Sequence, residues 1–188
     1  MSTVGIALRK APGGLRLTKM LCAHPEVNCP RENTPDLRRH FGTGWLLDFD
    51  SEFEQWSNRL LETFRRRRYI AVLSSVTAAE VEQAPEKVKR VHAELIAAGA
   101  ELLTVSQEAM DLLGKYKAKK ILGPKFQNDM LHIALATIAD ADVLVSWNFR
   151  HIVRLDKIRL FNAVNIECGY KPLTIYSPRE VVPDETID

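Results

Sequence analysis

The sequence predicts an α/β domain with a three-layer α/β/α architecture, in which helices cover both faces of a central parallel sheet. Two observations favour this fold. Short apolar runs such as YIAVLSS (69–75) and DVLVSW (142–147) are typical of buried parallel strands. These runs alternate with segments whose apolar residues recur every three or four positions, as on one face of a helix. Strands that alternate with helices predict parallel strands joined by helical crossovers.

The elements are expected in the following order. A first helix begins near Asp50 or Ser51, either of which can cap it, and ends at the basic run Arg65–Arg68, where cations complement the helix dipole. After the strand 69–75 we expect a short helix, a helix at 85–99 closed by Gly99, and a strand at 101–105. Next come a helix at 106–120 opened by Ser106, an apolar helix at 128–141, and the strand 142–147. The last expected elements are a helix at 156–169 and an edge strand at 173–177 closed by Pro178.

Residues 1–47 differ from the rest of the chain in composition and in hydrophobic pattern. They contain several prolines and glycines and show no sustained periodicity. We therefore expect an irregular N-terminal segment at 1–47, followed by one domain at 48–188, a size that allows a well-buried core.

Composition bounds the function only loosely. The chain of 188 residues is 46% hydrophobic and 27% charged, as in ordinary globular proteins. The net charge of +2 does not by itself indicate a nucleic-acid-binding protein. Two basic clusters, Arg65–Arg68 and a second one, have two interpretations: each could contact RNA, or each could be an ordinary solvated surface. The second cluster consists of Lys115, Lys117, Lys119, Lys120 and Lys125.

The number of cysteines and the hydropathy of the chain indicate the cellular compartment in which we expect the protein. Cys22, Cys29 and Cys168 are few and odd in number, which favours a reduced cytoplasmic protein, and their spacing with His24 matches no zinc pattern. No apolar run approaches the ~18 residues of a membrane span, so we expect no membrane association.

Three polar side chains are candidate site residues because of where they follow the expected strands. Glu80 comes after the strand 69–75, Asp129 lies in the first turn of the apolar helix, and Asn148 comes after the strand 142–147. In parallel sheets, sites lie beyond the carboxyl ends of strands. Convergent oxygen ligands suit a hard cation such as Mg²⁺, which would activate water and stabilise charge on a phosphate.

Each candidate also has a purely structural interpretation. Thr77 and Glu80 have the spacing of a helix capping box, Asp129 is favourable at a helix start by the dipole alone, and Asn148 is a common turn residue. Both interpretations stay open at this point.

The sequence resembles the PIN domain, and within that family the small bacterial VapC-like toxins. The resemblance covers about 50–182 and is carried by LSSVTAAEVEQAPEKV, NDMLHIALATIADADVLVSWNFRHIV and FNAVNIECGYKPLTIYSPREVV. It implies a cytoplasmic Mg²⁺- or Mn²⁺-dependent ribonuclease, the toxin of a type II toxin–antitoxin pair, which forms a homodimer and binds a cognate antitoxin. By this resemblance Glu80, Asp129 and Asn148 match the second, third and fourth acidic positions and are expected to be catalytic and to bind the metal. The amide of Asn148 adds no negative charge.

The family's first catalytic acid, an Asp at the end of a central first strand, has no match here, and Asp48 is a weak substitute. Two interpretations of the segment are open: a divergent N-terminus with its own role, or residues translated out of frame. The codons possible for 37–46, shifted by one nucleotide, can spell Tyr-Val-Asp-Thr-Ser-Val-Leu-Gly-Gly, a good opening strand for this family. Residues such as GWLLDF (44–49) would otherwise fill the slot. We therefore expect weak metal binding and little cleavage, with an inactive RNA- or antitoxin-binding module as the alternative.

Overall fold

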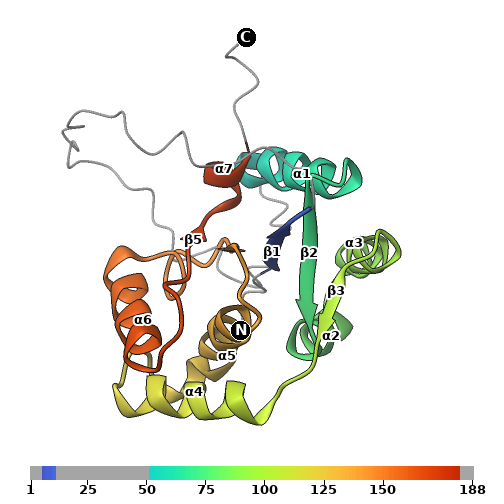
Figure 1. Cartoon of the computed structure of the whole chain (residues 1–188). Helices are drawn as coiled ribbons and strands as arrows, with labels where there is room; N and C mark the ends of the chain where they lie inside the picture. Colours follow the sequence, from blue (N-terminus) through green and yellow to red (C-terminus); the bar gives the residue numbers. More distant parts are fainter. Residues whose placement is uncertain (1–5, 12–50, 183–188) are drawn as a thin grey trace, which may run out of the picture.

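The computed structural model describes residues 6–11 and 51–182. They form an α/β domain around a five-stranded sheet with the strand order β3-β2-β1-β4-β5 (Figure 1). The strands are β1 (Ile6–Lys10), β2 (Tyr69–Ser74), β3 (Glu101–Leu103), β4 (Val143–Val145) and β5 (Ile175–Tyr176). The helices are α1 (Ser51–Arg65), α2 (Ser75–Glu82), α3 (Glu86–Ala97), α4 (Gln107–Ala118), the 3₁₀ helix η2 (Pro124–Phe126), α5 (Gln127–Ile138), α6 (Leu155–Glu167) and α7 (Pro178–Val181).

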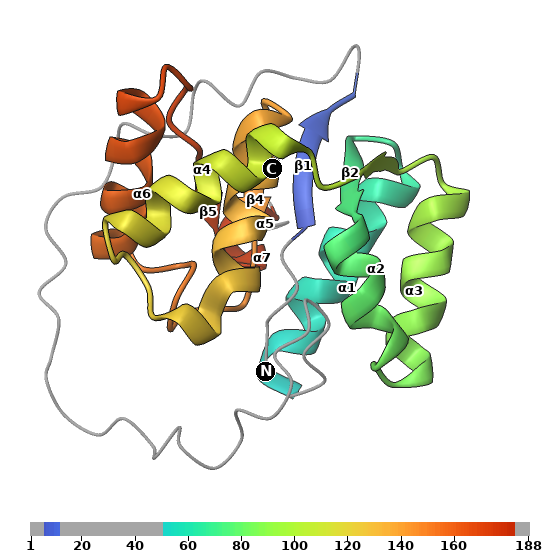
Figure 2. The ribbon, with the colours of Figure 1, turned by 90° about the horizontal axis from the view of Figure 1, so that it is seen from below.

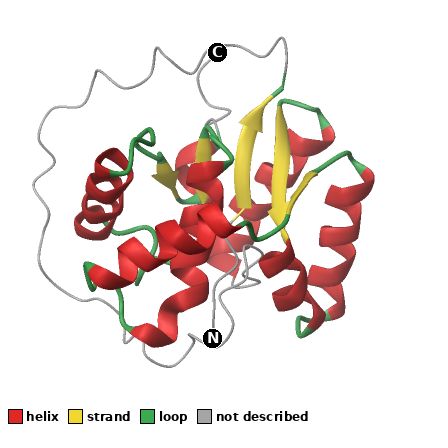
Figure 3. Ribbon diagram, turned by 60° about the horizontal axis from the view of Figure 1, so that its bottom comes forward, coloured by secondary structure: helices red, strands yellow, loops and turns green. Residues whose placement is uncertain are grey.

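The sheet is mixed, so the expectation of a parallel sheet is wrong. β2 is parallel to β3 and β4 is parallel to β5, but the central β1 is antiparallel to both β2 and β4. Figure 3 shows β1 and β2 side by side, with their arrowheads at opposite ends. The four later strands therefore all end at the same edge of the sheet, which we call the carboxyl edge.

The central strand comes from the segment expected to be irregular, and that expectation is wrong for Ile6–Lys10. Ile6, Ala7 and Leu8 are buried and supply the apolar side chains that a central position requires. Three apolar residues are too short a run to show a periodicity, which is why sequence reasoning overlooked this strand. Residues 12–50, including the candidate strand GWLLDF and Asp48, lie outside the described residues, as do Cys22 and Cys29.

The register of β1 aligns its two neighbours. Ala7 pairs with Val72 on one side and with Leu144 on the other, so these two residues lie at the same level of the sheet. Ser74 and Ser146, each two residues further along, then lie at matching levels at the carboxyl edge. The candidate residues after β2 and β4 are thereby brought to one edge, on either side of the slot that β1 fills.

Helices cover both faces of the sheet, as expected. One core joins Ala7, Val72 and Leu144 of the sheet with α4, α5 and α6. The other joins Ile6, Leu8 and Leu73 with α1, α3 and α7. Figure 2 shows α4, α5 and α6 on one side of β1 and β2, and α2 and α3 on the other side. Alternate residues of one strand supply the two cores because successive side chains of a strand point to opposite faces.

The local signals at helix ends behave as predicted. Ser106 caps α4 by accepting a hydrogen bond from the Ala109 N–H at 3.2 Å. Gly99 has φ +92° after α3, a conformation that favours glycine and ends the helix. Within the described part of the chain, no helix is both long and apolar enough to span a bilayer.

Candidate functional site

The topology brings the elements of the three candidate residues to the carboxyl edge. Glu80 lies in α2, which begins where β2 ends, and Asn148 follows β4. Asp129 lies in the first turn of α5, which leads back along the sheet into β4 and so begins at the edge where β4 ends.

Glu80 is held against the start of α5. Its Oε1 accepts a hydrogen bond from Asn128 Nδ2 at 3.1 Å, and its Oε2 lies 3.1 Å from His132 Nε2. The side chain of His132 is 3% exposed and that of Glu80 is 11% exposed. Glu80 is thus a nearly enclosed carboxylate with a partner for each of its oxygens.

The capping-box interpretation of Glu80 is wrong. The residue that caps α2 is Ser74, whose Oγ accepts a hydrogen bond from the Thr77 N–H at 3.2 Å and lies 3.1 Å from Thr77 Oγ1. Because Ser74 performs the cap, the carboxylate of Glu80 reaches across to α5 instead. Asn128, which it contacts, is the neighbour of Asp129 in the chain.

Asp129 is buried, with 1% of its surface exposed. It lies at the positive end of the α5 dipole, which stabilises a negative charge there. The dipole interpretation and the ligand interpretation of Asp129 both remain compatible with this position.

Asn148 shapes the turn after β4, as its structural interpretation holds. Its Oδ1 accepts a hydrogen bond from the His151 N–H at 2.9 Å, and its own N–H donates to Ser146 Oγ at 3.1 Å. Its backbone carbonyl accepts from the N–H groups of Ile152 and Val153. The amide oxygen that was expected to bind metal therefore already has a donor.

The described residues do not form a complete site for a divalent ion. No group of three or more His, Cys, Asp or Glu side chains within 6–11 and 51–182 is placed to hold one. The central strand does not repair this, because β1 presents its N-terminal end at the carboxyl edge and its residues, IALRK, include no carboxylate. The donor set is two carboxylates and one neutral amide, which is a weak cage for Mg²⁺.

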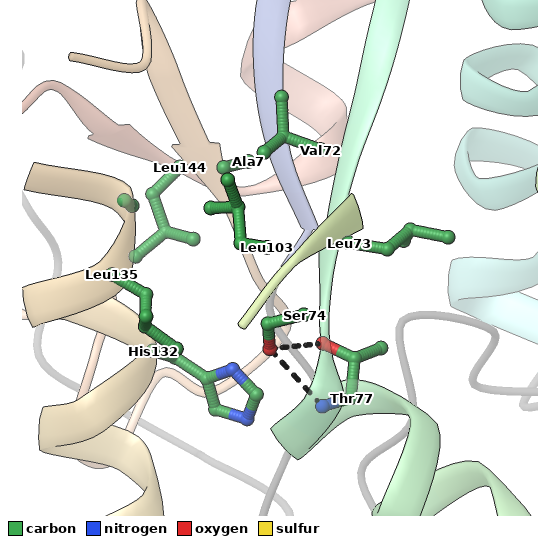
Figure 4. A pocket seen from close by; sticks show the side chains of 10 residues that line it. Ala7, Val72, Leu73, Ser74, Thr77, Leu103, His132, Leu135 and Leu144 are labelled. Atoms are coloured by element: carbon green, nitrogen blue, oxygen red, sulfur yellow. Dashed lines mark hydrogen bonds between the residues drawn. The ribbon is translucent and has the colours of Figure 1, made fainter. Parts of the chain in front are cut away.

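A small pocket lies at the end of β2, next to this site. His132, Ser74 and Thr77 supply its polar lining, and aliphatic side chains supply the rest (Figure 4). Its volume of about 10 Å³ is the room that a single water molecule needs. The pocket is therefore too small to receive a nucleotide, and any larger substrate would lie outside it.

Cations surround the turn that follows Asn148. The ring of His151 stacks on that of Phe126, with 3.7 Å between the ring centroids. Burial and, to a smaller extent, four nearby cations lower the pKa of His151 to about 4. These cations are Arg150, Lys125, Arg154 and Lys157.

Sequence analysis named Glu80 as a candidate but missed the two side chains that hold its carboxylate, Asn128 and His132. Neither of these two residues is among the candidates named from the sequence. Their spacing of four residues places both on one face of α5, which was the available signal. What the sequence could not supply is that this face meets Glu80, because the contact joins residues 48 and 52 positions apart.

Comparisons of the chain with protein-family models, with curated proteins and with solved structures find no match.

Proposed function

We propose that this protein is a PIN-like, divalent-metal-dependent ribonuclease of the type II toxin class, with a weakened metal site and slow hydrolysis of RNA phosphodiesters. The proposal rests on the resemblance of 50–182 to this family and on one observation. The carboxylate of Glu80 is held at the first turn of α5, the turn that contains Asp129, at the carboxyl edge of the sheet.

Glu80 and Asp129 are the residues that would hold Mg²⁺ or Mn²⁺, with an amide oxygen from Asn148. The bound ion would supply charge neutralisation at the phosphate and an activated water. The chain's own contribution is orientation: Asn128 and His132 fix the rotamer of Glu80, and the Ser146 hydroxyl fixes Asn148.

Three features support a weakened rather than a fully active site. Each oxygen of Glu80 already has one protein partner, which leaves this carboxylate fewer lone pairs to offer an ion. Asn148 is neutral and its oxygen accepts a backbone hydrogen bond. The reversed β1 adds no carboxylate at this edge.

The same features favour a second candidate function, a catalytically inactive module that binds RNA or an antitoxin. Such a module would keep the fold and would still bind its partner in the cytoplasm, but it would not hydrolyse RNA. A homodimer and a cognate antitoxin belong to both proposals, as the resemblance implies.

The test is cleavage of a single-stranded RNA by the purified chain with Mn²⁺, with Mg²⁺ or with EDTA. We expect slow cleavage with Mn²⁺ that is lost in Glu80→Gln and in Asp129→Asn, two variants that change charge but little volume. Glu82→Gln is the matched control, because Glu82 is an exposed acid of the same helix.

The outcomes separate the two candidates. Cleavage that needs metal, Glu80 and Asp129 supports the ribonuclease. Binding of RNA or of an antitoxin with no cleavage under any metal supports the inactive module. Cleavage unaffected by both variants contradicts the proposed site.

A further inference from the structure

Positively charged side chains cluster around the turn after β4. Lys125 in η2 and Arg150 in the turn come from segments that are separated in sequence by α5 and β4. The stacked rings of Phe126 and His151 join these two segments. This ring contact holds the two segments together, so Lys125 and Arg150 both lie around His151.

Two of these cations have no ion-pair partner within the described ranges. Lys125 lies 4.9 Å from the centroid of the Phe126 ring, and Lys125 and Arg150 are both exposed. Lys157 donates to the backbone carbonyl of Ile121 at 2.8 Å, which fixes the ammonium without neutralising it. Arg154 is different, because Asp156 pairs with it through two contacts of 2.8 and 2.9 Å.

An aromatic side chain stands beside these cations. Phe149, directly before Arg150, is 41% exposed, and its ring lies 5.9 Å from that of Trp147. Sites for single-stranded nucleic acid combine a positive surface for the backbone with aromatic rings on which bases stack. An acidic peptide would need the charge alone.

We propose that Lys125, Arg150 and Lys157, ordered around the Phe126–His151 stack, bind the phosphodiester backbone of single-stranded RNA, with a base stacked on Phe149. This inference rests on the proposed function, since it names the path of its substrate. The cations are close to the carboxyl edge because Lys125 lies two residues before α5 and Arg150 lies two residues beyond Asn148. RNA bound there would pass beside Glu80 and Asp129.

The experiment measures binding of a fluorescent single-stranded RNA of about ten nucleotides by anisotropy, in EDTA, so that neither cleavage nor an ion bridge contributes. The double variant Lys125→Gln and Arg150→Gln should bind more weakly and with a smaller salt dependence. Each lost phosphate contact lowers the slope of log affinity against log salt by about 0.7. Between roughly 50 and 200 mM salt, the affinity of the wild type should therefore fall about sevenfold more than that of the variant.

The matched control is the double variant Arg66→Gln and Arg68→Gln. It removes the same net charge from the other exposed basic cluster, which lies at the opposite edge of the sheet where β2 begins. We expect its affinity and salt slope to equal those of the wild type. Phe149→Leu should weaken binding about fivefold and leave the salt slope unchanged, because it removes stacking and no charge.

Several results would overturn the inference. Equal losses in the two double variants would mean that only net charge matters. Binding by the first double variant at the wild-type level would exclude this surface, while the ribonuclease proposal would stand. Competition by a polyglutamate peptide as strong as that by unlabelled RNA, with no effect of Phe149→Leu, would assign the surface to an acidic protein segment. Failure of the wild type to bind RNA at any salt concentration would instead contradict the proposed function in RNA binding and cleavage.

Discussion

Glu80 shows how burial and donors decide the role of a single carboxylate. An enclosed carboxylate is costly unless hydrogen bonds stabilise its charge, and Asn128 and His132 supply them. The spacing of Thr77 and Glu80 in the sequence is equally suited to a helix cap. What decides between the two roles is Ser74, which takes the cap and leaves Glu80 to face α5.

His151 carries a prediction about pH. Its pKa is lowered to about 4, first by burial and then by the positive charges of Arg150, Lys125, Arg154 and Lys157. Above about pH 6.5 the ring is neutral in both the folded and the unfolded chain. As the pH falls from 6.5 toward 4, the unfolded chain binds a proton that the folded chain does not, so the free energy of unfolding decreases.

The measurement is the His151 ring titration by NMR, together with Tm as a function of pH. We expect His151 to titrate near pH 4. His151→Gln, which removes the titrating group, should lose less of its Tm between pH 6.5 and 4.5 than the wild type does. A ring that titrates near its ordinary value in the folded protein would contradict the described packing of this turn.

At the level of elements, periodic segments were predictable and short ones were not. The helices α1, α3, α4 and α5 follow from their spacing and caps, because each has several turns over which a pattern can repeat. The direction and origin of β1 did not follow, since Ile6–Lys10 has only three apolar residues and its partners in β2 lie 59 to 65 positions away. The candidate site follows the same division: strand ends indicated Glu80, Asp129 and Asn148 as candidates, whereas the contacts that hold Glu80 against α5 are long-range.

A buried polar network links α4, α5 and α6, and it gives a prediction about stability. The Tyr116 hydroxyl donates to Asn165 Oδ1, and Asn165 Nδ2 donates to Thr137 Oγ1 at 3.1 Å. Tyr116→Phe leaves the buried acceptor of Asn165 without this donor, so we expect a loss of about 1–3 kcal/mol in the free energy of unfolding. Urea denaturation measures it.

Tyr170→Phe is the control for this network. The hydroxyl of Tyr170 also donates to a side-chain oxygen, that of Glu108, but this pair is exposed to solvent. Its change should stay within about 0.5 kcal/mol. Equal effects of the two substitutions would mean that the network of Tyr116 is no more sheltered from water than this surface pair.

The central strand gives a second prediction at this scale. Leu8 is fully buried in β1 and packs into the core with α1 and α3. Leu8→Ala should lower the free energy of unfolding by about 2–5 kcal/mol through the cavity it creates. Leu102→Ala, in the edge strand β3 where Leu102 is 62% exposed, should change it by less than about 0.5 kcal/mol. A small effect at Leu8 would show that Ile6–Lys10 does not fill the central slot in solution.

Considered as a whole molecule, the protein is built from two apolar cores, one on each face of the sheet. Both cores meet the sheet through β1, which supplies Ala7 to one and Leu8 to the other. A strand in either direction can provide these side chains and the backbone hydrogen bonds. Only a parallel strand would place its carboxyl end, and an acid there, between Glu80 and Asn148.

This difference gives the last prediction, a gain of function. In the test protein, residues 37–45 are replaced by Tyr-Val-Asp-Thr-Ser-Val-Leu-Gly-Gly, the segment that the shifted frame can spell. The new strand competes with Ile6–Lys10 for the central slot and brings a carboxylate to the carboxyl edge. We expect Mn²⁺-dependent RNA cleavage to rise at least about tenfold, for which about 1.4 kcal/mol of added transition-state stabilisation suffices.

The control is the same replacement with asparagine in place of its aspartate, which keeps the strand and lacks the charge. Equal cleavage by the two proteins would contradict a role for the missing acid. No gain from the aspartate version, with metal binding also unchanged, would contradict the prediction that an acid supplied by this segment restores the site.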